Sequence, residues 1–151
     1  MYMIKMNQIV EKAVSHFREG FNCAESVLMA YVEVNNIESK IIPIIATGFG
    51  GGIGRRGSVC GALNGAIMAL GLKYGRDKID LVSYDLCVSK CSQCYEGFKN
   101  EFGSVFCRDL TGCDLSTNEG RVTFKEHRLK ELKCVKYVES ASKIVLNLTQ
   151  E

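Results

Sequence analysis

The stretch KIDLVSYDLCVSKCSQCYEGFKNEF, residues 78–102, decides the fold class of this chain. Its apolar side chains recur at steps of three and four residues, the spacing that places them on one face of an α-helix: Leu81, Tyr84, Val88, Cys91, Tyr95, Phe98 and Phe102. We expect a long helix with this stripe facing the core. No segment alternates apolar and polar residues for long enough to form a sheet. The sequence therefore predicts an all-α fold.

Helical periodicity and helix-capping residues predict further helices on both sides of this stretch. One covers about residues 4–19 and ends at Gly20. Asn22, followed three positions later by Glu25, is the pattern of a capping box and predicts a helix that begins at Cys23. A last helix carries apolar residues at steps of four and three: Cys134, Val138, Ala141, Val145 and Leu148.

The middle of the chain contains a short apolar run, a glycine-rich segment and another helix. Ser39 can cap a short helix over the run that contains Pro43, although a buried strand is the competing interpretation. Six glycines in GFGGGIGRRG, residues 48–57, predict a loop. Ser58 can cap a helix over 58–72, in which Gly61, Gly65 and Ala69 allow close approach of another backbone. Residues 110–120 are rich in turn formers and predict a loop.

Length and composition predict one compact bundle of five or six helices with a glycine-rich loop. The chain has 151 residues and is 46% apolar, which suits one domain over 1–151 with one core. With 19 basic and 17 acidic residues, charge does not predict nucleic-acid binding. The first ten residues do not resemble a signal peptide, and no apolar run is long enough to span a membrane. We therefore expect a cytoplasmic protein in a reducing compartment.

Eight cysteines indicate redox or metal chemistry, because reduced compartments disfavour structural disulfides. Cys23, Cys60 and Cys134 lie near predicted helix starts, where unpaired N–H groups and the helix dipole stabilise a thiolate. Each also lies on an apolar stripe, so we expect their sulfurs to converge in a partly dry pocket, with Cys107 as the fourth member. The alternative is that these cysteines serve only as small buried apolar residues.

Four segments resemble a family of redox-active proteins named C_GCAxxG_C_C: GFNCAESVLMAY, GFGGGIGRRGSVCGALNGAIMALGLKYG, FGSVFCRDLTG and CVKYVESA. By this resemblance the family's cysteines fall on Cys23, Cys60, Cys107 and Cys134. Its central motif falls on Cys60, Gly61, Ala62 and Gly65, where this chain reads CGALNG, with cysteine before glycine. A similar domain occurs in split-Soret cytochromes, where it is linked to an iron–sulfur cluster. This chain has no C-x-x-C-H sequence for haem attachment.

The four cysteines suit an iron–sulfur cluster that transfers electrons, because thiolates are the usual ligands of such clusters. The backbone N–H groups of the glycine-rich loop and of the motif are candidate donors to the cofactor, at Gly50, Gly51, Gly52 and Gly61. Arg55 and Arg56 are candidates to balance a negatively charged cluster or to steer an anionic partner. We expect a redox partner protein of unknown identity, and a second copy of the chain is a further candidate partner.

Other interpretations remain open on the sequence alone. A thiol–disulfide protein without metal needs only two of the four cysteines, and a helical interaction module needs none of their chemistry. A zinc site ranks lower, since steps of 37, 47 and 27 residues separate the four cysteines. Cys87, Cys91 and Cys94 match the cluster motif of radical S-adenosylmethionine enzymes, but the chain is too short for their barrel. A G-x-G-x-x-G pattern from Gly52 to Gly57 lacks the following strand of a dinucleotide site.

Overall fold

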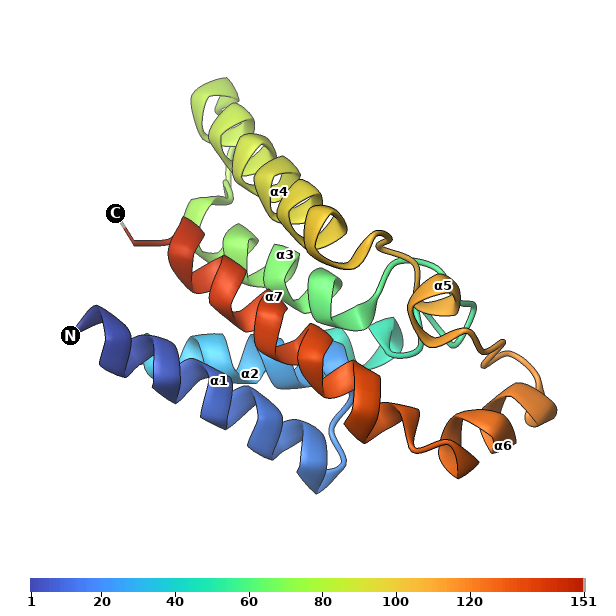
Figure 1. Cartoon of the computed structure of the whole chain (residues 1–151). Helices are drawn as coiled ribbons and strands as arrows, with labels where there is room; N and C mark the ends of the chain where they lie inside the picture. Colours follow the sequence, from blue (N-terminus) through green and yellow to red (C-terminus); the bar gives the residue numbers. More distant parts are fainter. Residues whose placement is uncertain (151) are drawn as a thin grey trace.

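Within residues 1–150 all regular elements are helices, so the all-α prediction is confirmed (Figure 1). The structure is a computed structural model and describes residues 1–150. Its α-helices are α1 (Tyr2–Glu19), α2 (Cys23–Val34), α3 (Gly61–Tyr74), α4 (Leu81–Phe102), α5 (Cys107–Thr111), α6 (Asn118–Glu126) and α7 (Val135–Leu148). A 3₁₀ helix, η1 (Ile44–Phe49), and a π-helical turn, η2 (Lys130–Cys134), complete the set. No helix within residues 1–150 has the length and apolar character of a membrane span.

The boundaries of the first two helices follow from local signals in the sequence. The predicted capping box is present at α2, where the Asn22 side chain accepts a hydrogen bond from the Glu25 N–H at 2.9 Å. The Glu25 carboxylate in turn accepts one from the Asn22 N–H at 2.8 Å. These two bonds satisfy backbone N–H groups that the helix itself cannot pair, and they fix Cys23 as its first residue.

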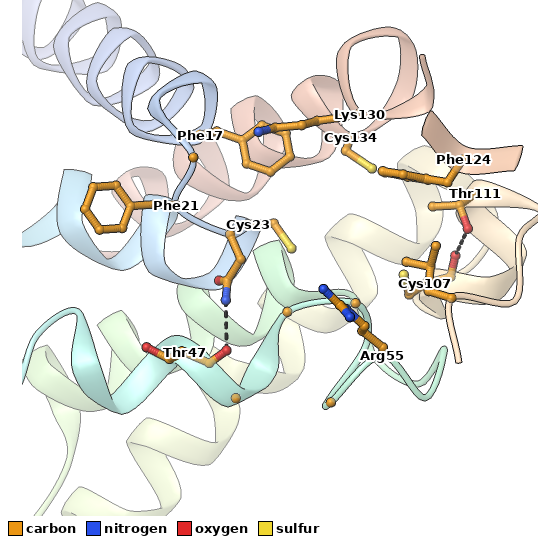
Figure 2. A pocket seen from close by; sticks show the side chains of 17 residues that line it. Phe17, Phe21, Cys23, Thr47, Arg55, Cys107, Thr111, Phe124, Lys130 and Cys134 are labelled. Atoms are coloured by element: carbon orange, nitrogen blue, oxygen red, sulfur yellow. Dashed lines mark hydrogen bonds between the residues drawn. The ribbon is translucent and has the colours of Figure 1, made fainter. Parts of the chain in front are cut away.

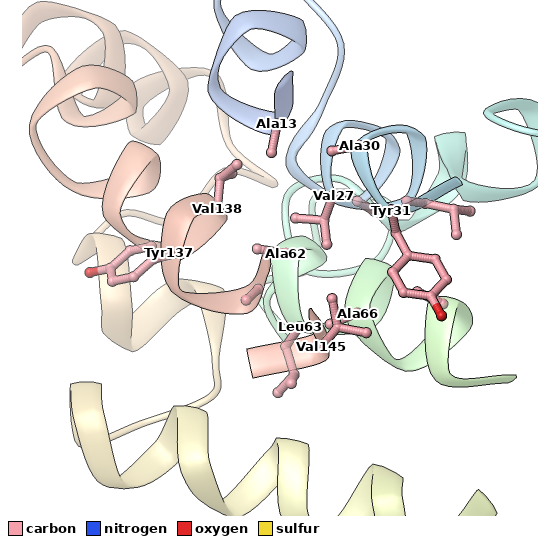
Figure 3. Packing of buried hydrophobic residues seen from close by; sticks show 14 of the residues in the cluster. Ala13, Val27, Ala30, Tyr31, Ala62, Leu63, Ala66, Tyr137, Val138 and Val145 are labelled. Atoms are coloured by element: carbon pink, nitrogen blue, oxygen red, sulfur yellow. The ribbon is translucent and has the colours of Figure 1, made fainter. Parts of the chain in front are cut away.

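Helix α7 runs through the middle of the bundle and contacts α1, α2, α3 and α4. Its buried residues interleave with those of α1, α2 and α3 in one apolar core (Figure 3). Helices α2 and α3 approach closely, because a Cβ atom on Gly65 would lie only 2.6 Å from the Ala24 carbonyl oxygen. This confirms the close approach predicted for the glycine side of α3.

Helix α4 forms where the sequence predicts it, but the predicted core-facing stripe is wrong in its first half. Asp80 caps the helix by accepting hydrogen bonds from the N–H groups of Val82 and Ser83. Leu81 is 70% exposed and Val88 47%, and within the helix only Cys94 and Phe98 are buried. The first half of α4 extends beyond the neighbouring helices (Figure 1), so its periodic apolar side chains stay largely exposed.

The run around Pro43 makes turns and then the short helix η1, in line with the helical interpretation and not with the competing strand. Two further expectations need correction. Helix α3 begins at Gly61 with Cys60 as its N-cap residue, because the backbone of Ser58 is already paired with Gly52 and Cys107. The predicted loop 110–120 contains the end of α5 and the beginning of α6. The sequence analysis did not predict helix α6, because none of its residues is buried and it therefore has no core-facing apolar stripe.

The predicted glycine-rich loop contains a left-handed turn. Residues 51–55 have φ angles of 66°, 69°, 64°, 56° and 63°, all in the region that side chains disfavour. Three of these residues are glycines, for which this conformation costs little. Ile53 and Arg55 are not, and each costs about 1–2 kcal/mol of strain in such a conformation. The turn lies directly before Cys60 and borders the site described next.

Candidate functional site

Four cysteines from distant parts of the chain meet at one end of the bundle. Helices α2 and α3 begin there, beside α5 and η2 (Figure 1). Cys23, Cys60, Cys107 and Cys134 line one cavity of about 20 Å³. Leu110, Thr111 and Tyr137 close this cavity, together with the backbone of Gly61. All four sequence-predicted cysteine ligands therefore lie at one place.

A short backbone pairing holds Cys60 beside Cys107. Val59 and Phe106 form an isolated antiparallel bridge. On its two sides the Cys60 N–H donates to the Val105 carbonyl at 2.7 Å, and the Cys107 N–H donates to the Ser58 carbonyl at 2.7 Å. These bonds join the segment before α3 to the segment before α5. They set the separation of the two cysteines without depending on either side chain.

Cys23 is the most acidic of the four thiols. The Cys60 thiol donates a hydrogen bond to its sulfur, and backbone N–H groups of Gly51, Ala24 and Cys23 itself also point to it. These donors lower the pKa of Cys23 to about 7, although burial opposes the charged form. Two of the N–H groups belong to the start of α2, as predicted for a thiol at a helix N-terminus.

The other three cysteines are held as neutral thiols when no metal is bound. The hydrogen bond to Cys23, then burial and the Cys23 charge, raises the pKa of Cys60 well above its usual range. Burial, followed by the charges of Cys23 and Cys113, raises the pKa of Cys107 to about 11. Burial, followed by the charges of Cys23 and Cys107, raises the pKa of Cys134 further still. The mutual effects of these groups follow from their closeness in an apolar site.

The predicted cofactor-binding glycines line the site or support it. A Cβ atom on Gly61 would lie 2.4 Å from the Cys23 sulfur, so only glycine leaves room for that sulfur. A Cβ atom on Gly52 would lie 2.7 Å from Cβ of Cys107. Gly50 and Gly51 line a larger pocket next to the cavity. The Gly51 N–H also donates a hydrogen bond to the Cys23 sulfur.

Cys134 is the N-cap residue of α7, near a helix start as predicted, but it is also the last residue of the π-helical turn η2. The Val135 N–H donates to the Lys130 carbonyl, five residues back. The backbone around Cys134 is thus already helical, and no run of unpaired N–H groups faces its sulfur. Such π-helical turns frequently occur at functional sites, where they redirect a side chain.

None of the other four cysteines lines the cavity. Cys94 is fully buried on α4, and burial raises its pKa to about 12. Cys87 and Cys91 lie on the same helix, beside a surface pocket that Ile67 and Tyr95 also line. Cys113 packs against Cys107 in a small cluster with Leu115. Within residues 1–150, no group of three or more Cys, His, Asp or Glu side chains is arranged to hold a single metal ion.

Sequence reasoning missed the residues that close the cavity behind the cysteines. The Tyr137 hydroxyl donates to the Leu110 carbonyl at 2.8 Å and ties α7 to α5. The Thr111 hydroxyl donates to the Cys107 carbonyl at 2.8 Å. Thr111 lies four residues after Cys107 on the same short helix, a spacing that offers a weak signal. The sequence gives no comparable signal for Tyr137, because buried tyrosines are common on helix faces.

Comparisons with known proteins identify the family of this chain. Residues 21–148 match the family model described as "Putative redox-active protein (C_GCAxxG_C_C)". A curated protein from Archaeoglobus fulgidus, described as "Uncharacterized protein", is 33% identical over 144 residues, which cover 90% of this chain and 89% of the relative. The comparison with solved structures gave no match.

Proposed function

This chain belongs to the C_GCAxxG_C_C family of redox-active proteins, and from that premise we propose that it binds an iron–sulfur cluster on Cys23, Cys60, Cys107 and Cys134. The chain acts as one redox domain that passes electrons to and from a partner. The observation that carries this proposal is the single cavity that all four cysteines line. A thiol–disulfide reaction needs only two cysteines, whereas a cluster commonly takes four.

The donor set at this site suits a cluster better than a single ion. Thiolates are soft ligands, and backbone N–H groups already point to the Cys23 sulfur, as they do to the sulfurs of iron–sulfur sites. No group of three or more potential ligands within residues 1–150 is spaced for one ion. A cluster spreads its ligands more widely. The cavity between the four cysteines is small, and the adjoining pocket of about 520 Å³ shares three of them.

When bound, a cluster would supply one-electron chemistry at this end of the bundle. The residues of the chain have separate parts in holding it. The four cysteines would be ligands, Gly61 and Gly52 leave room beside their sulfurs, and the Gly51 N–H stabilises negative charge on Cys23. Tyr137 and Leu110 exclude water from the closed side of the cavity.

Purification without oxygen tests the proposal. The protein should be coloured, with a visible spectrum typical of an iron–sulfur cluster and with iron and acid-labile sulfide in similar amounts. Cys60→Ser should lose the colour and the iron. Cys87→Ser, which changes a cysteine outside the cavity, should keep both. A colourless protein without iron would overturn the proposal, as would a Cys60→Ser protein with an unchanged spectrum.

One observation favours a second candidate, a dithiol that cycles without metal. The Cys60 thiol donates directly to the Cys23 sulfur, so an attacking thiolate and a resolving thiol lie side by side. Oxidation by the disulfide of a partner would join the two sulfurs, release one proton from the Cys60 thiol and transfer two electrons to that disulfide. Differential alkylation of iron-free protein, followed by mass analysis, would detect this bond. The same bond should be absent from Cys60→Ser, and a pair that stays reduced under mild oxidants would eliminate this candidate.

A further inference from the structure

A pocket of about 520 Å³ lies directly in front of three of the four cysteines. Cys23, Cys107 and Cys134 form part of its wall (Figure 2). The rest comes from the end of α1 and the segment after it, from η1 and the glycine-rich turn, and from α5, the loop after it, α6 and η2. Its volume falls within the range of pockets that hold small organic molecules. The sequence analysis did not anticipate it, since its wall combines segments far apart in the chain.

Apart from the acidic thiol of Cys23, the charged side chains that line this pocket are cations. Arg55 and Lys130 line it from two sides, and none of its lining residues is Asp or Glu (Figure 2). Within residues 1–150 neither cation forms an ion pair with a carboxylate. The Lys130 ammonium lies 4.7 Å from the centre of the Phe17 ring and stays beside the pocket. Two unpaired cations in one concave site favour an anion.

The backbone at Arg55 strengthens this conclusion. Its φ angle of 63° is one that glycine adopts freely and that arginine adopts only with strain. The neighbouring Arg56 has no such angle and does not line the pocket. Strain of this kind is typical of functional sites, where the surrounding structure holds a residue in place. Here it places a guanidinium at the mouth of the pocket.

The remaining walls are mainly apolar. Three aromatic rings and a leucine line the pocket: Phe17, Phe21, Phe124 and Leu115. The Asn22 side chain is already occupied, since it donates to the Thr47 carbonyl at 2.8 Å and accepts from the Glu25 N–H at 2.9 Å. The hydroxyls of Thr47 and Thr111 are occupied too, because they donate to the Glu25 carboxylate and the Cys107 carbonyl, each at 2.8 Å. Besides the cysteine sulfurs, the side-chain polar groups left for a ligand are therefore the two cations, while the walls offer contacts to an apolar body.

We propose that this pocket binds a small organic anion, a carboxylate or a phosphate monoester, whose charged group lies between Arg55 and Lys130 and whose apolar body contacts the aromatic rings. The guanidinium of Arg55 suits both kinds of anion, because its planar fork can form two parallel hydrogen bonds. The inference rests on the pocket itself and does not require a bound cluster. It assigns the open side of the cysteine site to a small molecule.

Calorimetric titration of the full-length protein tests the inference with benzoate, phenyl phosphate and the neutral benzyl alcohol as probes. At least one anion should bind about tenfold more tightly than the alcohol, and the stronger anion identifies the charged group. Arg55→Gln and Lys130→Gln should each weaken that anion about tenfold and leave the alcohol unchanged. Arg56→Gln is the matched control and should bind as the original protein does. Arg55→Gly also removes the guanidinium, and glycine adopts the backbone conformation of this position without strain. Weaker anion binding by this variant therefore cannot be attributed to backbone strain.

Iron-loaded and iron-free protein should be titrated in parallel, with iron content recorded. Anion binding without iron would support the pocket even if the cluster proposal failed. Equal binding of anions and alcohol, or equal effects of Arg55→Gln and Arg56→Gln, would overturn the inference while leaving the cysteine chemistry intact. A bound anion should also slow alkylation of Cys23, which lies in the pocket wall, and an unchanged rate would contradict the assigned position.

Discussion

Gly61→Ala should disturb both the packing of the bundle and the chemistry of Cys23. The new Cβ atom would lie 2.4 Å from the Cys23 sulfur and 3.0 Å from the Phe49 carbonyl oxygen. Non-bonded atoms of this size need about 3.5–4.0 Å, so the sulfur must move by more than about 1 Å or α3 must shift. Overpacking of this kind costs about 1–3 kcal/mol. Displacement of the sulfur would also break its hydrogen bond with Cys60.

Two other glycines of α3 provide matched controls. A Cβ atom on Gly71 would meet no atom within 4 Å, so Gly71→Ala should raise the free energy of unfolding by about 0.5–1 kcal/mol. A Cβ atom on Gly65 would meet the Ala24 carbonyl at 2.6 Å but no sulfur. Gly65→Ala should therefore destabilise the bundle without changing Cys23. The difference in free energy of unfolding between Gly61→Ala and Gly71→Ala gives the steric cost of the new Cβ atom, about 1–3 kcal/mol.

Two measurements separate these effects. Urea denaturation gives the free energy of unfolding of each variant, and alkylation of iron-free protein at pH 7 gives the reactivity of Cys23. Loss of the Cys60 hydrogen bond returns the pKa of Cys23 toward that of an ordinary thiol, so alkylation of Gly61→Ala should slow by about tenfold. Gly65→Ala and Gly71→Ala should react at the original rate. Stability and reactivity in Gly61→Ala that match those of Gly71→Ala would refute this account of the site.

Three other predictions test the remaining features. In iron-free protein, the alkylation rate of Cys23 should rise with pH, reach half of its maximum at about pH 7 and level off at higher pH. The reason is that the thiolate is the reactive form and the pKa of Cys23 is about 7. Cys60→Ala removes the donor and should move this midpoint to higher pH, and an unchanged midpoint would contradict the assigned hydrogen bond. Ile53→Gly should raise the free energy of unfolding by about 1 kcal/mol in urea denaturation, because it relieves a φ of 64° at a half-exposed side chain. A loss of stability would disprove strain at that position. Phe98→Ala should cost about 3–5 kcal/mol and Val88→Ala less than about 1 kcal/mol, and equal losses would mean that α4 buries the stripe predicted from the sequence.

The helical fold was predictable because its main signals are local. Periodicity identified α4 and α7, and the capping pair Asn22 and Glu25 located the first residue of α2. The face that α4 buries was not predictable, since periodicity does not reveal where neighbouring helices end. Leu81 and Val88 share the spacing of core residues but are 70% and 47% exposed.

The candidate site was predictable only in part. Convergence of the cysteines could be inferred from their places on apolar stripes and from the family resemblance. The hydrogen bond from the Cys60 thiol to Cys23, and the pairing of residues 58–60 with 105–107, depend on tertiary structure. The pocket with Arg55 and Lys130 depends on it too, because no local pattern relates residues 75 positions apart.

The wide separation of the four cysteines in sequence also determines when the site can exist. Cys23 and Cys134 lie 111 positions apart, so a long loop must close before they meet. Local helices form within microseconds, whereas contacts between such distant residues form late in folding. Since Cys134 directly precedes α7, which packs against four other helices, the site is completed only when α7 docks. A nascent chain that lacks its last residues therefore presents scattered thiols, and the assembled centre marks the end of folding.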